Sequence, residues 1–173
     1  LNSLPMGFYS ASQLIQDARR HHIPVLPVCI NASEAEHTLV FNNGDKAIRL
    51  GMNLVKNLSS EAIQTLLTNR PSVGFKTLDH IKQQAVSEKD LSALASADAF
   101  SSIAGNRYQA RWQMMDRHTT LPLFSNSAEQ LPFDFLPNDT DSLLEDYAST
   151  SLSLKHHPIE LVLRKHTIKN LRL

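Results

Sequence analysis

The segment Leu54–Ala62 (Leu-Val-Lys-Asn-Leu-Ser-Ser-Glu-Ala) constrains the fold most strongly, because it joins an apolar–basic pair, a short turn and a helix start. Ser59 and Ser60 are residue types that cap helices, and apolar residues follow them at helical spacing. A tight turn before a helix exposes backbone N–H groups, and the positive end of the helix dipole faces the same way. The segment therefore predicts a helical unit that presents a turn to which a phosphate can bind without base recognition.

This order of turn and helix is that of a helix-hairpin-helix motif, in which Lys56 would add a charge beside the phosphate. The motif usually has glycines on both sides of its central apolar residue, whereas Asn57 and Ser59 flank Leu58 here. Asparagine tolerates left-handed backbone angles and serine can cap the helix, so the turn can still form. From local sequence alone, an ordinary capped helix in a helical domain is favoured, because short motifs often match by chance. If the motif is real, DNA contacts are predicted at Lys56, Asn57, Leu58, Ser59 and Ser60.

Before this segment, the sequence predicts one helix and a small β element. A capping-box pattern opens a helix over Ser10–Arg20. Two prolines interrupt the apolar run Ile23–Ile30, which is typical of an extended edge segment. His37–Phe41 and Lys46–Leu50 flank an Asn-Gly turn, the signature of a β-hairpin. The fold class predicted is therefore mostly α with a small β element.

The sequence predicts mainly helices from residue 59 onward. Four are predicted, at Ser59–Pro71, Phe75–Val86, Ser87–Ala95 and Ala104–Met115. Prolines and serines then accumulate over 118–142, as in a linker, and a short helix is expected around Leu143–Tyr147.

Composition limits the kind of partner this chain can have. Its 173 residues include 17 Lys plus Arg and 17 Asp plus Glu, a formal net charge of zero, so nucleic-acid contact requires a local patch. Cys29 is the only cysteine, which excludes an internal disulfide and a cysteine zinc cluster. No apolar run has transmembrane length. A cytoplasmic protein without membrane contact is expected.

Arg107 and Arg111 are four residues apart and share a predicted helix face beside Trp112. Such a face can line a nucleic-acid groove, and both arginines are candidate DNA contacts. The alternative is a core tryptophan with arginines on the solvated rim, which is favoured for Trp112.

Leu121, Leu123 and Phe124 form a short apolar peptide in the predicted linker. It is a candidate partner-binding peptide that would insert into a hydrophobic pocket. Without other information, an anchor on its own domain is the favoured alternative.

No metal site or catalytic centre is predicted. The residues of the pairs His21-His22 and His156-His157 point in different directions, and no ligand spacing is present. The acidic run Asp139–Asp146 is an ordinary complement to a helix dipole.

Several blocks occur in a fixed order along the chain: Pro5–Tyr9, Asp17–Arg20, Asn31-Ala-Ser33, Ile48–Gly51, Val55-Lys56, Phe75–Leu78 and Ala97–Phe100. Together they resemble bacterial C-family DNA polymerases, the family of the polymerase III alpha subunit. Glu145-Asp-Tyr147, Leu152–Lys155 and His157-Pro158 are more similar to the error-prone ImuC branch. The resemblance covers nearly the whole chain and favours the helix-hairpin-helix interpretation.

The resemblance implies four parts. Residues 1–43 would be the end of a fingers region and include the start of the β-hairpin, and residues 44–117 would form a tandem helix-hairpin-helix domain. Residues 118–142 would be a linker, and residues 143–173 would lead toward an OB domain. The domain at 44–117 would hold primed duplex DNA behind the active site. The family's catalytic aspartates lie in an upstream palm domain, so this chain is expected to be a non-catalytic C-terminal fragment. Magnesium is implied for the parent polymerase and no cofactor for this chain.

The error-prone branch acts in translesion synthesis and DNA-damage tolerance, so the resemblance implies two partners. They are a catalytically inactive Y-family relative and a RecA-like accessory protein. Thr120–Phe124 resembles the family's sliding-clamp peptide without its leading glutamine, so clamp recruitment is expected to be indirect. Leu4 also replaces a glutamine common before Pro-Met-Gly-Phe-Tyr.

Two other functions remain open. These helices can form a protein-interaction module that docks a mutagenesis partner with little DNA contact, as the neutral charge and absent hairpin glycines favour. A free-standing helix-hairpin-helix repair protein is the third possibility.

Overall fold

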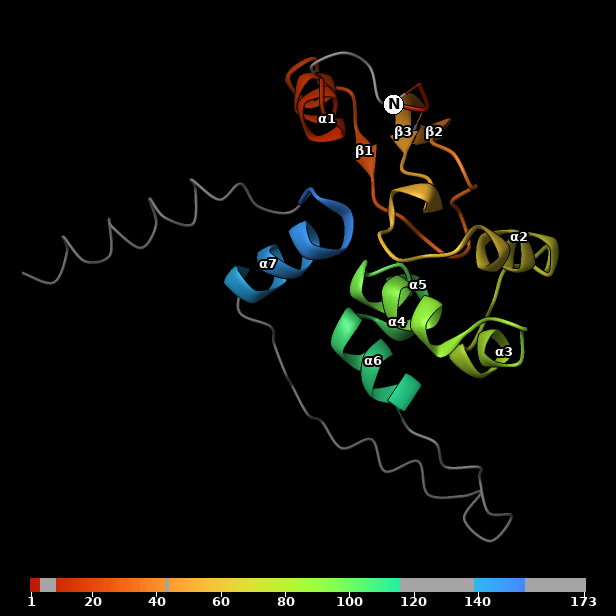
Figure 1. The fold of residues 1–173 in the computed structure, drawn as a ribbon. Helices are drawn as coiled ribbons and strands as arrows, with labels where there is room; N and C mark the ends of the chain where they lie inside the picture. The colour runs from red at the N-terminus through yellow and green to blue at the C-terminus, as the bar shows by residue number, and fades with distance from the viewer. Residues whose placement is uncertain (4–8, 43, 116–138, 155–173) are drawn as a thin grey trace, which may run out of the picture.

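The computed structural model describes residues 1–3, 9–42, 44–115 and 139–154. Helix α1 (Ala11–Arg20) and a small sheet lie at one end, and a cluster of short helices forms the other (Figure 1). The capping box predicted at α1 is present: Ser10 Oγ accepts from the Gln13 amide, and the Gln13 side chain accepts from the Ser10 amide. The helix predicted over Ser10–Arg20 is confirmed.

The sheet has three strands in the order β1-β3-β2. The hairpin of β2 (Thr38–Asn42) and β3 (Asp45–Arg49) is antiparallel, with Asn42 opposite Asp45, which confirms the predicted hairpin. The edge strand β1 (Val25–Leu26) runs parallel to β3 and is short because a proline lies on each side of it. The predicted edge segment is therefore also confirmed.

A turn after β1 connects the sheet to the helices. The Asn31 side chain accepts from the Phe75 amide (2.7 Å) and donates to the Phe75 carbonyl (2.9 Å). Buried Ser33 donates to the Leu50 carbonyl (2.7 Å) and accepts from the Cys29 amide (3.0 Å). These bonds fix the position of the helical cluster relative to the hairpin.

The helical cluster begins with a single 3₁₀ turn, η1 (Met52–Leu54). Its helices are α2 (Ser60–Thr68), α3 (Leu78–Lys82), α4 (Glu88–Ser96), α5 (Ser101–Ala104) and α6 (Arg107–Met115). Helix α7 (Asp139–Thr150) lies beside α4 and α6 (Figure 1). The predicted mostly α fold class with a small β element is confirmed.

Two predicted helices differ from the structure. The helix predicted over Phe75–Val86 is limited to α3, because Thr77 caps its first turn and Phe75 is buried beside Asn31. The helix predicted over Ala104–Met115 is divided into α5 and α6, because Gly105 between them has a φ of +80°.

Helix α7 is longer than the helix predicted over Leu143–Tyr147. It begins at Asp139, inside the predicted linker, because acidic residues favour a first helical turn. The rest of that linker and the segment after Leu154 lie outside the described residues.

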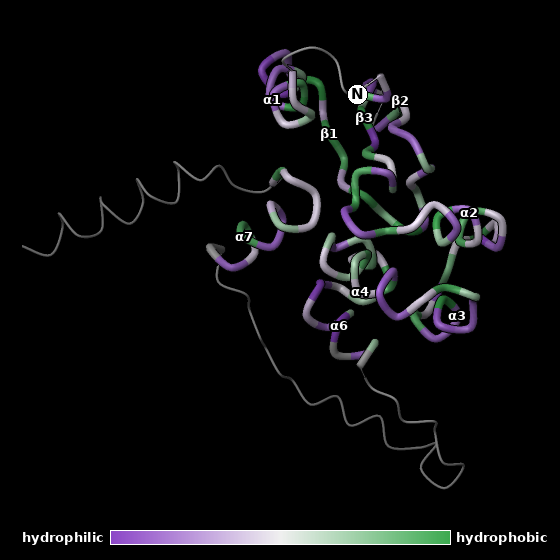
Figure 2. Tube along the Cα trace, in the orientation of Figure 1, coloured by the Kyte–Doolittle hydropathy of each residue, from purple (hydrophilic) through white to green (hydrophobic). Residues whose placement is uncertain are grey.

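The hydrophobic core is continuous from the sheet into the helical cluster. Ile30, Phe75, Leu94 and Phe100 belong to one buried cluster, and the Ile30 amide donates to the Ala99 carbonyl. Figure 2 shows β1 in hydrophobic colours and α1 largely in hydrophilic ones. The predicted boundary between residues 43 and 44 thus has core residues on both sides, and the four-part division stays a prediction. Within the described residues, every helix is too short or too polar to cross a lipid bilayer.

Gly51→Ala is expected to destabilise the fold through a steric clash. A Cβ there would lie 2.3 Å from the Glu36 carbonyl carbon and 2.6 Å from the Ala35 oxygen, both backbone atoms. Overpacking of this kind costs about 1–3 kcal/mol, measurable as the free energy of urea unfolding. Ser72→Ala, at an exposed position, is the control and should stay within about 0.5 kcal/mol of wild type. A Gly51→Ala protein that is no less stable than Ser72→Ala would contradict the clash.

Candidate nucleic-acid interface

The turn between η1 and α2 has the backbone geometry of a tight hairpin. Asn57 has a φ of +62°, the left-handed conformation for which the usual glycine is suited. Ser59 is the N-cap of α2, and its Oγ accepts from the Ala62 amide (3.2 Å). Leu58 is half-buried against the core, whereas Ser60 is exposed at the helix start. Asn57 therefore adopts the left-handed conformation predicted for it, and Ser59 caps the helix as predicted.

A second turn of the same kind joins α4 to α5. Asp98 has a φ of +59°, and the Ala99 amide donates to the Leu94 carbonyl. Ala99 and Phe100 are fully buried beneath the turn. Two hairpin turns, each with a left-handed polar residue, thus lie within one helical cluster.

The buried carboxylate of Asp90 already accepts a hydrogen bond from one of the backbone amides that were expected to bind phosphate. Asp90 Oδ1 accepts from the Ser59 amide at 2.7 Å, and Oδ2 accepts from Ser87 Oγ at 2.5 Å. Burial, the largest influence, would raise the pKa of Asp90, but hydrogen bonds from Ser87 and Ser59 and the charge of Lys89 together lower it. Asp90 is therefore a stable anion beside the turn. The next two amides, of Ser60 and Glu61, lie in the first turn of α2, where the helix offers them no acceptor.

Lys56 is held at both ends by the last turn of α7. Its amide donates to the Ser149 carbonyl (2.8 Å), and its Nζ donates to the Tyr147 carbonyl (3.2 Å). A cation at the negative end of a helix dipole is favourable. The side chain remains exposed, so it can also meet an external anion.

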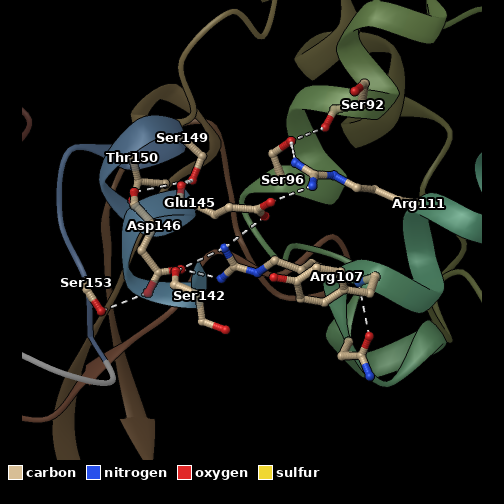
Figure 3. A network of polar contacts seen from close by, with 12 residues as sticks. Ser92, Ser96, Arg107, Arg111, Ser142, Glu145, Asp146, Ser149, Thr150 and Ser153 are labelled. Atoms are coloured by element: carbon tan, nitrogen blue, oxygen red, sulfur yellow. Dashed lines mark hydrogen bonds and ion pairs between the residues drawn. The ribbon is translucent and has the colours of Figure 1, made fainter. Parts of the chain in front are cut away.

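Arg107, a predicted DNA contact, is buried in an ion-pair network with α7 (Figure 3). Its guanidinium pairs with Asp146 and with Glu145 Oε2 (3.5 Å), and only 3% of its side chain is exposed. Burial alone would lower the pKa of Arg107, but the hydrogen bond and charge of Asp146, with Asp98 and Glu145, raise it. In this arrangement the guanidinium faces carboxylates of its own chain, and its DNA contact stays a prediction.

Arg111 lies on the same face of α6 and is more accessible, with 36% of its side chain exposed. It donates to Glu145 Oε1 (2.6 Å) and to Ser96 Oγ (2.7 Å), as Figure 3 shows. The shared face predicted for the two arginines is confirmed. It is oriented toward α7, which holds Arg111 in one geometry.

Asp90, Glu145 and Asp146 are site residues that were not predicted from the sequence. Ser87 caps α4 and its Oγ accepts from the Asp90 amide, but the Asp90 side chain bonds to the distant Ser59 amide instead of its own N-cap amide. The acidic residues of α7 were interpreted as dipole complements. Glu145 and Asp146 are adjacent, and they lie 34 to 39 residues from the arginines that they pair with, so no local spacing indicates these ion pairs.

Some predicted site residues are not described. Leu121, Leu123 and Phe124 lie outside the described residues, as does the side chain of Trp112. In the described part of the chain, no group of three or more His, Cys, Asp or Glu side chains is placed to hold a metal ion.

A turn with a left-handed residue followed by a capped helix is the geometry of a helix-hairpin-helix protein. The helix-hairpin-helix motif family matches residues 22–110, and the chain belongs to this family.

The chain is also similar to proteins named error-prone DNA polymerase. One from Vibrio vulnificus (strain CMCP6) is 53% identical over 167 residues, covering 94% of this chain and 16% of that protein. Those from Idiomarina loihiensis (41% identical, 98% of this chain) and Teredinibacter turnerae (44%, 96%) are each covered over 17% of their length. The chain thus spans about a sixth of these relatives.

Arg107→Ala should remove the partner of two carboxylates on α7. Loss of one member of a buried ion pair costs about 3–5 kcal/mol of unfolding free energy, which urea denaturation measures. Arg20→Ala, at an exposed arginine that ends α1, is the control and should stay within about 0.5 kcal/mol of wild type. Equal stabilities of the two variants would contradict the structural role of Arg107.

Asp90→Asn should change how stability depends on pH. Because the folded-state pKa of Asp90 is lowered, its carboxylate stabilises the fold fully above its usual pKa of 3.8, and this stabilisation is lost as pH falls from there through the lower folded-state pKa. The difference in unfolding free energy between wild type and Asp90→Asn should therefore shrink from pH 7 to pH 3. Glu61→Gln, at an exposed carboxylate in the first turn of α2, is the control. If the wild-type protein exceeds Asp90→Asn in unfolding free energy by the same amount at pH 7 and pH 3, the Asp90 carboxylate is not the stabilising group.

Proposed function

We propose that this chain is the tandem helix-hairpin-helix part of an error-prone DNA polymerase of the C family, in the ImuC-like branch, and that it holds primed duplex DNA. The observation that supports this proposal most directly is the first hairpin turn, in which Asn57 has the left-handed conformation and Ser59 caps α2. The exposed start of α2 then presents amides and a helix dipole to a phosphate, with Lys56 beside them. The similarity to error-prone DNA polymerases supports this role.

The parent protein, in this proposal, is a cytoplasmic polymerase that transfers deoxynucleotides with magnesium bound in a palm domain outside this chain. It acts in translesion synthesis during DNA-damage tolerance and repair. This chain adds DNA holding and partner docking but no catalytic group. The proposed partners are the inactive Y-family relative and the RecA-like accessory protein, with the sliding clamp reached indirectly and Leu121, Leu123 and Phe124 as the docking peptide.

A second candidate is a protein-interaction module with little DNA contact. Leu39 and Phe41 are 76% and 78% exposed on the edge strand β2, where alternate residues share one face. The Ser59 amide and Arg107 are also engaged within the chain. An apolar interface of this kind would be much less sensitive to salt than phosphate contacts.

Fluorescence anisotropy on primed duplex DNA across a salt series separates the two functions. We expect the logarithm of affinity to fall with the logarithm of salt concentration by about 0.9 for each phosphate contacted. Lys56→Glu should weaken binding and reduce this slope, because it reverses a charge beside the hairpin. Lys46→Glu makes the same change on the exposed side of β3 and should have little effect. A folded chain that does not bind duplex DNA at low salt would exclude the DNA-holding role and favour the interaction module.

A further inference from the structure

A cleft of about 360 Å³ lies beside the first hairpin turn, between α4, α6 and α7. Lys56 lines it from the hairpin, Lys89 from α4, and Arg111 from α6. Ser92 and Ser96 contribute from α4 and Glu145 from α7. Its volume is at the low end of the range for small-ligand sites, about 300–1,000 Å³.

The charge of this cleft differs from that of the chain as a whole. Lys56, Lys89 and Arg111 oppose the single carboxylate of Glu145, whereas the whole chain has a net charge of zero. Lys89 is exposed, and its charge also acts on the neighbouring buried carboxylate of Asp90. Local positive charge of this kind attracts an anion even when the chain is neutral.

The donors in the cleft are held in place before a ligand arrives. Arg111 Nη2 donates to Ser96 Oγ, which in turn donates to the Ser92 carbonyl, whereas Arg111 Nη1 donates to Glu145 (Figure 3). Because Ser96 still holds the guanidinium when a phosphate replaces Glu145, little further freedom is lost on binding. The exposed Ser92 lies on the same wall, where its hydroxyl can donate a further hydrogen bond.

We propose that this cleft binds a backbone phosphate of duplex DNA and that Glu145 competes with that phosphate for Arg111. This inference rests on the proposed DNA-holding function. Duplex DNA carries one charge per about 1.7 Å of its axis, so a duplex held at the hairpin brings further phosphates to neighbouring cations. Lys56 belongs to both the hairpin and the cleft, so the two form one continuous surface. The phosphate is bound by side chains in the cleft and by backbone amides at the hairpin.

The first test is loss of a cation, by anisotropy with the complete 173-residue chain. Lys89→Gln should weaken duplex binding and lower the salt slope by about 0.9, the value for one phosphate contact. Lys76→Gln, at an exposed lysine that does not line the cleft, is the matched control and should leave the slope unchanged.

The second test is removal of the competitor. Glu145→Gln should raise duplex affinity by about fivefold, because Arg111 loses its anionic partner. Asp141→Asn makes the same charge change on an exposed residue of α7 outside the cleft and should have no comparable effect. Circular dichroism of Glu145→Gln verifies that α7 remains helical.

The outcomes separate this inference from the proposed function. Salt-sensitive duplex binding by wild type, with Lys89→Gln and Glu145→Gln equal to their controls, would overturn the cleft assignment and leave the DNA-holding role intact. A chain that binds no duplex overturns both. If the chain binds no duplex, calorimetry with inorganic phosphate tests the cleft directly. Binding heat that is present in wild type and lost in Lys89→Gln would then assign the cleft to free phosphate and not to DNA.

Discussion

The carboxylate of Asp90 connects the starts of two helices, and the geometry of the first hairpin depends on it. One oxygen accepts from the Ser59 amide at the start of α2, and the other accepts from Ser87 at the start of α4. An unsatisfied buried amide costs about 1–3 kcal/mol, so this bond restricts where the hairpin can lie. The same bond places a negative charge beside a turn whose proposed ligand is negative. The proposed phosphate therefore has to bind at Ser60, Glu61 and Lys56, on the exposed side of the turn.

Helix α7 imposes a similar internal competition on the basic face of α6. Glu145 and Asp146 neutralise the arginines that a neutral chain would otherwise present to DNA. Arg107 is fully committed to this network, whereas Arg111 is partly exposed and borders the cleft. The two arginines differ because the α7 carboxylates enclose one and only touch the other. In the proposed function, the affinity of the chain for DNA is thus limited by its own acidic helix.

Local sequence rules predicted most of the secondary structure. The capping box at Ser10, the Asn-Gly hairpin and the N-cap at Ser59 depend on interactions within a few residues, and all three are present. The division at Gly105 and the earlier start of α7 have local causes that were not predicted, whereas one other helix boundary was wrong because a distant contact decides it. The helix predicted from Phe75 begins later because Asn31 binds the Phe75 backbone.

The candidate site was less predictable than the fold. Asn57 and Ser59 were recognised because their backbone roles are local. The partner of Ser59 is 31 residues away, and the partners of Arg107 and Arg111 lie beyond a long intervening segment. A single sequence carries no signal that pairs such positions. The cleft, which four separate elements form, was for the same reason absent from the sequence analysis.

The central claim is that the first hairpin and its neighbouring cleft hold duplex DNA. The most direct measurement is mapping of backbone amide chemical shifts by NMR, with primed duplex DNA titrated into the complete chain at low salt. The account predicts that the largest changes occur at Lys56 to Glu61 and at Lys89 to Ser96. Changes concentrated instead on the exposed edge strand β2, or none at all in a folded chain, would contradict it.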